Sequence, residues 1–191
     1  MSWKPAYIRE QMRRFLALAS KEFYGGGTPN WDGTNLVVDI QIDENDMTVN
    51  ANLSPFGGGY GVLVSELFTL MVEDQIAQVF VLGHEYGHGM TETVMQAAGL
   101  TNLSGPAHEV IADLISAYIL SRMGIAPDQL VRALETAKEH VFNTHANQQQ
   151  AGHHPEGDDR ISYIQTLNVI MEGGHTFPQA LFLLLEQLGC S

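Results

Sequence analysis

The chain contains almost no cysteine and few basic residues. Its only cysteine, Cys190, is the penultimate residue, so neither an intrachain disulfide nor a thiolate-rich metal site can form. Lys and Arg number 9 against 22 Asp and Glu, and the formal net charge is -13. Because this charge repels a phosphate backbone and no basic stripe offsets it, we expect no nucleic-acid partner. Any bound metal must be held by His, Asp or Glu.

Long apolar runs are also missing. No stretch of about 18 uncharged apolar residues occurs, so we expect neither a membrane span nor a signal peptide, and hence a cytoplasmic protein. With 191 residues and 45% apolar composition, the chain is suited to a single domain over 1–191 with a sizeable core. No internal repeat or linker indicates a domain boundary. The sequence leaves the oligomeric state open.

Strands are expected only in the N-terminal third of the chain. Apolar and polar residues alternate over 36–42 and again over 47–53, and the polar link 43–46 predicts that the two strands form a β-hairpin. The glycine-rich segment 54–61 is expected to be a mobile loop, with a short strand at 62–64 after it.

Helical periodicity dominates the remainder, and Pro, Gly, Ser, Thr and Asp residues mark the ends of each segment. The segment from 145 to 157 is polar and predicts a loop. Together these patterns predict an α+β fold in which a small sheet packs on a mainly helical body. Helices are expected over 5–23, from Ser65 to Gly99, from Gly105 to Gly124, from Pro127 to about Thr144, from Arg160 to about Glu172, and from Thr176 to Gly189.

The sequence His84-Glu85-Tyr86-Gly87-His88 lies within the second of these helices. Two histidines four residues apart project side by side about one turn apart, so both can bind one ion. The intervening Glu85 lies at the edge of the same face, where its carboxylate reaches a metal-bound water without being a ligand. The alternative is a pair of histidines packed on a buried helix face.

A catalytic zinc site keeps three protein ligands and one open position, so a further ligand is required. Glu109 is the best candidate, because it lies on the next helix with Asp113 one turn later on the same face. Asp113 is expected to accept a hydrogen bond from the outer nitrogen of a ligating histidine. The alternative for Glu109 is a charge near the start of a helix that interacts favourably with the helix dipole.

The motif at 84–88, followed after twenty residues by Glu109-Val110-Ile111-Ala112-Asp113, resembles the gluzincin metallopeptidases, which carry HExxH and then ExxxD. The short connection between the two motifs is similar to that of thermolysin-like peptidases. The pattern ExxAD, with a later His154-Pro155, resembles soluble minimal relatives of the HtpX-type peptidases. This resemblance implies a zincin-like fold with an edge strand along the cleft. It further implies catalytic roles for His154 and Arg160, with His153 as an alternative to His154.

These observations predict a zinc-dependent peptidase that acts on peptide or protein substrates. Zinc would polarise the scissile carbonyl, and Glu85 would take a proton from the zinc-bound water and pass it to the leaving amine. A tyrosine could donate a hydrogen bond to the oxyanion, but the sequence does not choose among Tyr60, Tyr118 and Tyr163. The competing hypotheses are a regulatory metalloprotein with little or no proteolytic activity and a zinc-stabilised interaction module.

Overall fold

The computed structural model describes residues 2–143 and 156–189, which form an α+β fold. These residues contain a four-stranded mixed sheet and seven helices. The strands are β1 (Asn30–Trp31), β2 (Thr34–Asp43), β3 (Ala51–Phe56) and β4 (Gly59–Ser65), and the helices are α1 (Pro5–Phe23), α2 (Glu66–Met71), α3 (Gln75–Ala98), α4 (Gly105–Arg122), α5 (Pro127–Val141), α7 (Gly157–Glu172) and α8 (Phe177–Gln187).

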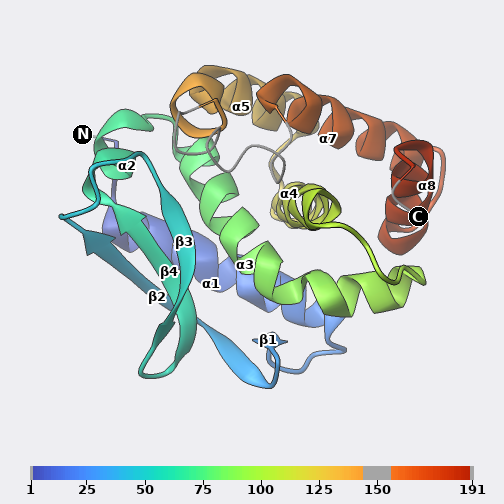
Figure 1. The fold of residues 1–191 in the computed structure, drawn as a ribbon, viewed down its shortest axis with the longest axis horizontal. Coiled ribbons are helices and arrows are strands. Elements are labelled where there is room, and N and C mark those ends of the chain that lie inside the picture. The colour runs from blue at the N-terminus through green and yellow to red at the C-terminus, as the bar shows by residue number, and fades with distance from the viewer. Residues whose placement is uncertain (1, 144–155, 190–191) are drawn as a thin grey trace.

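Helix α3 lies at the centre of the molecule, with the sheet on one side and α4, α5, α7 and α8 on the other (Figure 1). Helix α1 packs against both α3 and the sheet. Helix α3 is buried on nearly all of its faces, as expected for a helix that is apolar all round. The side chains that α3 presents to its neighbours therefore lie inside the protein.

The strand order β1-β2-β4-β3 differs from the expected hairpin. Strand β4 lies between the two predicted strands, parallel to β2 and antiparallel to β3. Val62 and Val64 make β4 the most deeply buried strand, with no exposed surface on either side chain. Pro55 cannot donate a backbone hydrogen bond, which suits β3 to the edge of the sheet. The hairpin prediction was therefore wrong in its pairing, and β3 is an edge strand.

The expected mobile loop over 54–61 was also wrong. Strand β3 continues to Phe56 and β4 begins at Gly59, so only two residues connect them. The register pairs Phe56 with Gly59 and continues to Ala51 opposite Val64. Glycines spread over this segment suggested a flexible loop, but pairing of β4 with both β2 and β3 orders the segment as two strand ends joined by a two-residue turn.

The single helix expected from Ser65 is divided into α2 and α3. The hydroxyl of Ser65 accepts a hydrogen bond from the backbone N–H of Phe68 at 3.0 Å and so caps α2. The carboxylate of Asp74 accepts from the N–H groups of Ile76 and Ala77 at 2.8 and 3.1 Å and starts a new helix. Because Asp74 starts a new helix shortly after α2 ends, helical periodicity continues across the break and did not reveal it.

The other predicted helices occur close to their expected bounds. Helices α1 and α4 match at their starts, α5 ends three residues earlier than expected, and α7 begins three residues earlier, at Gly157. Residues 144–155, which include most of the expected polar loop, lie outside the described residues. Within the described part of the chain, no helix has the length and apolar character needed to cross a membrane.

Candidate metal centre

His84 and His88 lie one turn apart on α3, and their imidazoles converge. The two Nε2 atoms are 3.0 Å apart, and the ring planes are nearly perpendicular at 82°. His84 is buried, whereas the side chain of His88 keeps 27% of its surface exposed. Both nitrogens therefore point to one small volume that opens to solvent on the His88 side.

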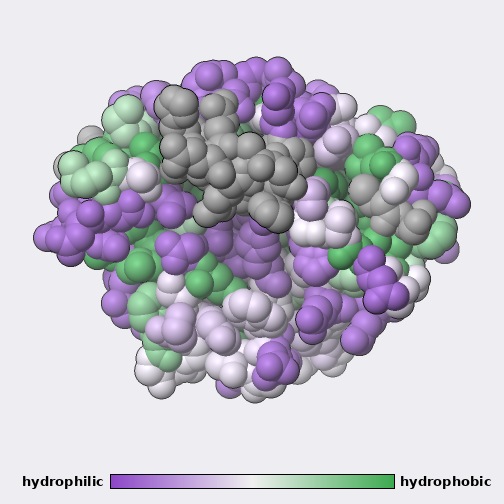
Figure 2. Space-filling view, in the orientation of Figure 1, coloured by the Kyte–Doolittle hydropathy of each residue, from purple (hydrophilic) through white to green (hydrophobic). Residues whose placement is uncertain are grey.

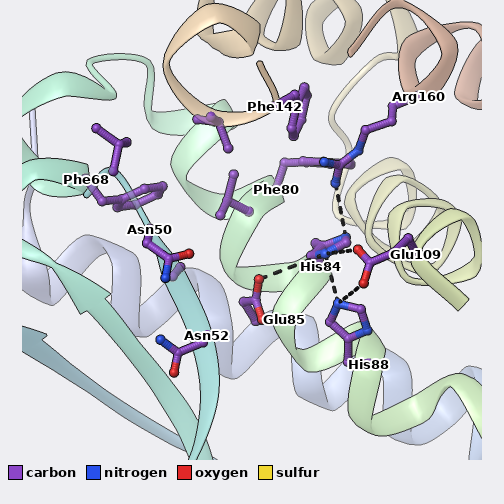
Figure 3. A pocket seen from close by; sticks show the side chains of 14 residues that line it. Asn50, Asn52, Phe68, Phe80, His84, Glu85, His88, Glu109, Phe142 and Arg160 are labelled. Atoms are coloured by element: carbon purple, nitrogen blue, oxygen red, sulfur yellow. Dashed lines mark hydrogen bonds and ion pairs between the residues drawn. The ribbon is translucent and has the colours of Figure 1, made fainter. Parts of the chain in front are cut away.

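Glu109, in the first turns of α4, faces both imidazoles (Figure 3). One carboxylate oxygen is 3.3 Å from Nε2 of His84, and the other is 3.4 Å from Nε2 of His88. For a tetrahedral zinc ion with bonds of about 2.0 to 2.1 Å, neighbouring ligand atoms are separated by about 3.3 Å. The separation of the two Nε2 atoms and the distance from each to its nearest Glu109 oxygen are close to that value, with a different oxygen facing each imidazole.

A close approach of α3 and α4 places Glu109 at this position. A Cβ atom on Gly87 would lie only 2.8 Å from the backbone oxygen of Ala112, which is shorter than a real Cβ contact allows. The absence of a side chain at Gly87 therefore lets the backbone of α4 pack directly on α3. Gly87 is the fourth residue of the histidine motif, so the motif itself contains the residue that permits this contact.

The carboxylate of Glu85 lies beside the imidazoles but is held by strand β3. One of its oxygens is 3.9 Å from Nε2 of His84, and the other accepts a hydrogen bond from the N–H of Leu53 at 3.2 Å. His84, Glu85 and His88 can offer metal-ligand atoms that lie within 4.8 Å of one another. Glu109 nevertheless approaches the His84 nitrogen more closely than Glu85 does.

Burial raises the pKa of Glu85 to about 7, with a further increase from the nearby Glu109. The positive charge of His84 and the Leu53 N–H act in the opposite direction but do not cancel the effect of burial. A carboxylate with a pKa near neutrality accepts and returns a proton readily at neutral pH. In the metal-free protein, the carboxyl group of Glu85 can therefore gain or lose a proton near neutral pH.

Arg160 and Asp113 form a buried ion pair behind His84. Asp113 Oδ1 is 2.8 Å from His84 Nδ1, and the Arg160 guanidinium donates to both Asp113 oxygens at 2.6 Å each. Desolvation alone would raise the pKa of Asp113, but Arg160 and His84 outweigh it and hold that pKa below its usual value. The guanidinium also lies over the Phe142 ring, with 3.9 Å between its carbon and the ring centroid.

The electrostatic environment of His84 is strongly acidic. Burial alone would lower the pKa of His84, but Asp113 above all, together with Glu109 and Glu85, raises it to about 10. In the absence of a metal, the imidazole is therefore protonated at neutral pH. A divalent cation at Nε2 would replace that proton and balance the same negative charges.

A pocket with a cavity volume of about 270 Å³ opens over these groups. Figure 3 shows Asn50 and Asn52 on the side of β3 and Phe68, Phe80 and Phe142 farther along the wall. On this face of the molecule, hydrophilic residues gather in a recess at the centre (Figure 2). The metal-site candidates therefore line a cavity that combines polar groups at the β3 edge with aromatic rings.

The structure brings together six of the seven residues singled out from the sequence. Glu109, Asp113 and Arg160 lie around the motif histidines, although they come from two other helices. His154 and the alternative His153 lie outside the described residues. Arg160 also lines the pocket, and its guanidinium is held by both oxygens of Asp113.

Several residues that line the pocket were not predicted from the sequence. Conversely, the three tyrosines considered as oxyanion donors do not line it. None of Tyr60, Tyr118 and Tyr163 is among the described residues that line it. The hydroxyl of Tyr118 donates to Glu22 at 2.8 Å, and the ring of Tyr60 packs on Trp31 at 4.9 Å. The missed residues carry no motif, and only their position identifies them: Asn50, Asn52, Phe68, Phe80 and Phe142.

Comparison of the chain with models of known protein families gave no match, and searches among curated proteins and solved structures gave none either.

Proposed function

We propose that the protein is a zinc-dependent peptidase of zincin-like fold that hydrolyses peptide bonds. The proposed metal ligands are His84, His88 and Glu109, and Glu85 is the proposed general base. The observation that carries the proposal is the set of separations of 3.0, 3.3 and 3.4 Å among the two Nε2 atoms and the Glu109 oxygens. Two neutral imidazoles and one carboxylate form a common ligand set of catalytic zinc.

The choice of Glu109 over Glu85 as ligand rests on position. Glu109 has an oxygen near each imidazole, whereas Glu85 is farther from His84 and is bound to the backbone of β3. A zinc ion held here would polarise a substrate carbonyl and lower the pKa of a bound water. The sequence resemblance to gluzincins, with HExxH and then ExxxD, leads to the same division of roles.

The chain's own residues have separate tasks in the proposed reaction. Glu85 takes a proton from the attacking water and returns it to the leaving amine, as its raised pKa permits. Asp113 holds the Nδ1–H of His84 and so directs Nε2 toward the ion, while Arg160 fixes Asp113. His154 remains a predicted contributor to the reaction.

A second function is a metalloprotein with little or no proteolytic activity, acting as a regulator or as an interaction module. The hydrogen bond from Leu53 N–H to Glu85 favours it, because this bond gives Glu85 a structural task between β3 and α3. In this case the ion would stabilise the fold, and a change at Glu85 would alter stability but no reaction.

Metal analysis and peptide cleavage together test the proposal. The purified protein should carry about one zinc per chain, and Glu109→Gln should lose it. Glu85→Gln should retain zinc but cleave no member of a diverse peptide library that the wild-type protein cleaves. The matched control is Glu92→Gln, an exposed change on the same helix that should alter neither property.

The outcomes separate the two functions. Zinc binding without cleavage of any peptide by the wild-type protein would favour the regulatory or interaction function. A protein that binds no zinc, even when zinc is added, would exclude both.

A further inference from the structure

Strand β2 has a free outer edge on the side of the sheet away from the metal-site candidates. Strand β4 pairs with one side of β2, and β1 pairs only with Thr34 and Asn35 on the other. The Tyr86 hydroxyl forms hydrogen bonds with the β2 backbone at Val37 and Asp39, and in the described residues no strand neighbours the outer side of β2 over 40–43. Figure 1 shows β3 next to α3 and β2 at the opposite margin of the sheet. An open edge of this kind is a template for pairing with another chain.

An apolar pocket lies directly beside this edge. Its cavity volume is about 340 Å³, and it lies between the start of α1 and the second half of β2. Ile42 leaves 46% of its surface exposed here, which is unusual for a large apolar side chain in a strand. The indole Nε1–H of Trp3 is buried and has no acceptor in the described residues. The lining residues are Trp3, Pro5, Ile8, Arg9, Ile40, Gln41 and Ile42.

Carboxylates follow the same edge. Asp39 and Asp43 lie on β2, and Glu44 and Asp46 follow in the next turn. Within residues 2–143 and 156–189, none of the four forms an ion pair with a Lys or Arg side chain; Asp43 and Asp46 instead accept hydrogen bonds from Asn45 and Thr48. Among the described residues that line the pocket, Arg9 is the only cation. The edge is thus negatively charged, and its carboxylates are available to pair with cationic side chains.

We propose that the outer edge of β2 binds an extended, basic segment of a partner protein, which adds to the sheet as a further strand. Backbone hydrogen bonds to 40–43 hold the segment, and one of its apolar side chains enters the pocket between Trp3 and Ile40. Lys or Arg residues of the segment then meet Asp39 and Asp43. This binding involves none of the proposed metal ligands and is independent of the proposed hydrolysis.

A second copy of this chain fits the edge less well. Two β2 strands related by a two-fold axis run antiparallel, which brings the aspartates of one copy near those of the other. Like charges that face each other across strands are destabilising. The net charge of -13 adds long-range repulsion between copies. A basic partner removes both penalties.

Fluorescence anisotropy with short labelled peptides tests the backbone requirement. A peptide of alternating Val and Lys should bind the full-length chain, and the corresponding Val and Glu peptide should not. N-methylation at every second residue removes the hydrogen-bond donors along one edge of the peptide. Because only one edge pairs with β2, one N-methylated series should lose binding and the other should retain it. Equal binding by both series would overturn strand addition.

Matched variants locate the binding surface. Asp39→Asn combined with Asp43→Asn should weaken binding of the Val and Lys peptide by about tenfold, through loss of nearby charge pairs. Glu172→Gln combined with Glu186→Gln changes the net charge equally on exposed positions of other helices and should have little effect. Equal weakening in both variants would mean attraction by net charge alone and would overturn the proposal.

Hydrogen exchange separates the two edges of the sheet. With the Val and Lys peptide bound, amides within 40–43 should gain protection, while those of β3 over 51–56 should not. Protection confined to β3 would place the peptide at the metal-site pocket and overturn the proposal. Dimerisation of the chain without peptide, abolished by the aspartate changes, would mean that a second copy occupies the edge and would also overturn it.

Discussion

The Arg160 guanidinium holds both oxygens of Asp113 at 2.6 Å, and one of these oxygens also contacts Nδ1 of His84 at 2.8 Å. Both charged side chains are almost fully buried, with 6% and 2% of their surface exposed. Helices α7, α4 and α3 thus meet at one charge network directly behind the proposed metal. The network links the stability of the fold to the orientation of a proposed ligand.

Breaking this pair should be costly. Arg160→Met leaves the buried Asp113 carboxylate with His84 as its remaining partner, and Asp113→Asn removes the carboxylate that pairs with the buried guanidinium, so each should lower the free energy of unfolding by about 3 to 5 kcal/mol. The double variant should lose much less than the sum. Asp113→Asn should also weaken zinc binding by about 10- to 100-fold. Denaturant unfolding and zinc titration measure both effects.

The exposed pair Arg132 and Asp128 is the control for that cycle. Its atoms are 2.8 Å apart, but its side chains are 70% and 66% exposed. The corresponding variants Arg132→Met and Asp128→Asn should each change the free energy of unfolding by less than about 1 kcal/mol. If the buried pair behaves like this exposed pair, the network does not stabilise the fold as argued.

Gly87→Ala should separate α3 from α4. The new methyl group would meet the backbone of Ala112, which cannot move without moving α4 and Glu109 with it. We expect a loss of about 1 to 3 kcal/mol in unfolding free energy, together with weaker zinc binding. Gly89→Ala is the control, because its methyl group would meet the ends of the Leu36 and Leu53 side chains rather than backbone atoms. Equal zinc affinity in the two variants would contradict the role given to Gly87.

Glu85→Gln should stabilise the metal-free protein at alkaline pH. Because the pKa of Glu85 is raised to about 7 by burial, ionisation in the folded state costs stability, and this cost develops as pH rises from the unfolded pKa toward 7. The variant should gain on the order of 1 to 3 kcal/mol above pH 7 and little at about pH 4. Thermal unfolding of both proteins with a chelator at the two pH values measures this gain in stability. An equal gain at both pH values would contradict the raised pKa of Glu85.

Zinc binding should release protons at neutral pH. The pKa of His84 is raised to about 10 by Asp113 and other acidic neighbours against the effect of burial, so metal-free His84 carries a proton that zinc must displace. Calorimetric titration in buffers of different ionisation enthalpy should report about one proton released per zinc, and apparent affinity should fall as pH falls. A binding enthalpy that is independent of the buffer would contradict the protonated state.

Local patterns in the amino-acid sequence predicted several of the residues that lie together at the candidate site. Spacing along one helix was enough to place His84 beside His88, because one turn of α-helix separates residues i and i+4. The same local rule placed Asp113 one turn after Glu109. Most helices were also predictable, since proline, glycine and capping residues act within a few positions of the chain. The exception was Asp74, whose cap divides a segment that periodicity presents as continuous.

Relations between distant segments were decided only by the tertiary structure. The sequence predicted that β2 and β3 pair with each other. The deeply buried strand β4 instead lies between them and pairs with both. Likewise, the position of Glu109 over the histidines depends on the α3–α4 contact at Gly87, and that of Arg160 on the packing of α7. The sequence thus determined the residues that meet along a helix, while packing in three dimensions decided which helices and strands meet around them.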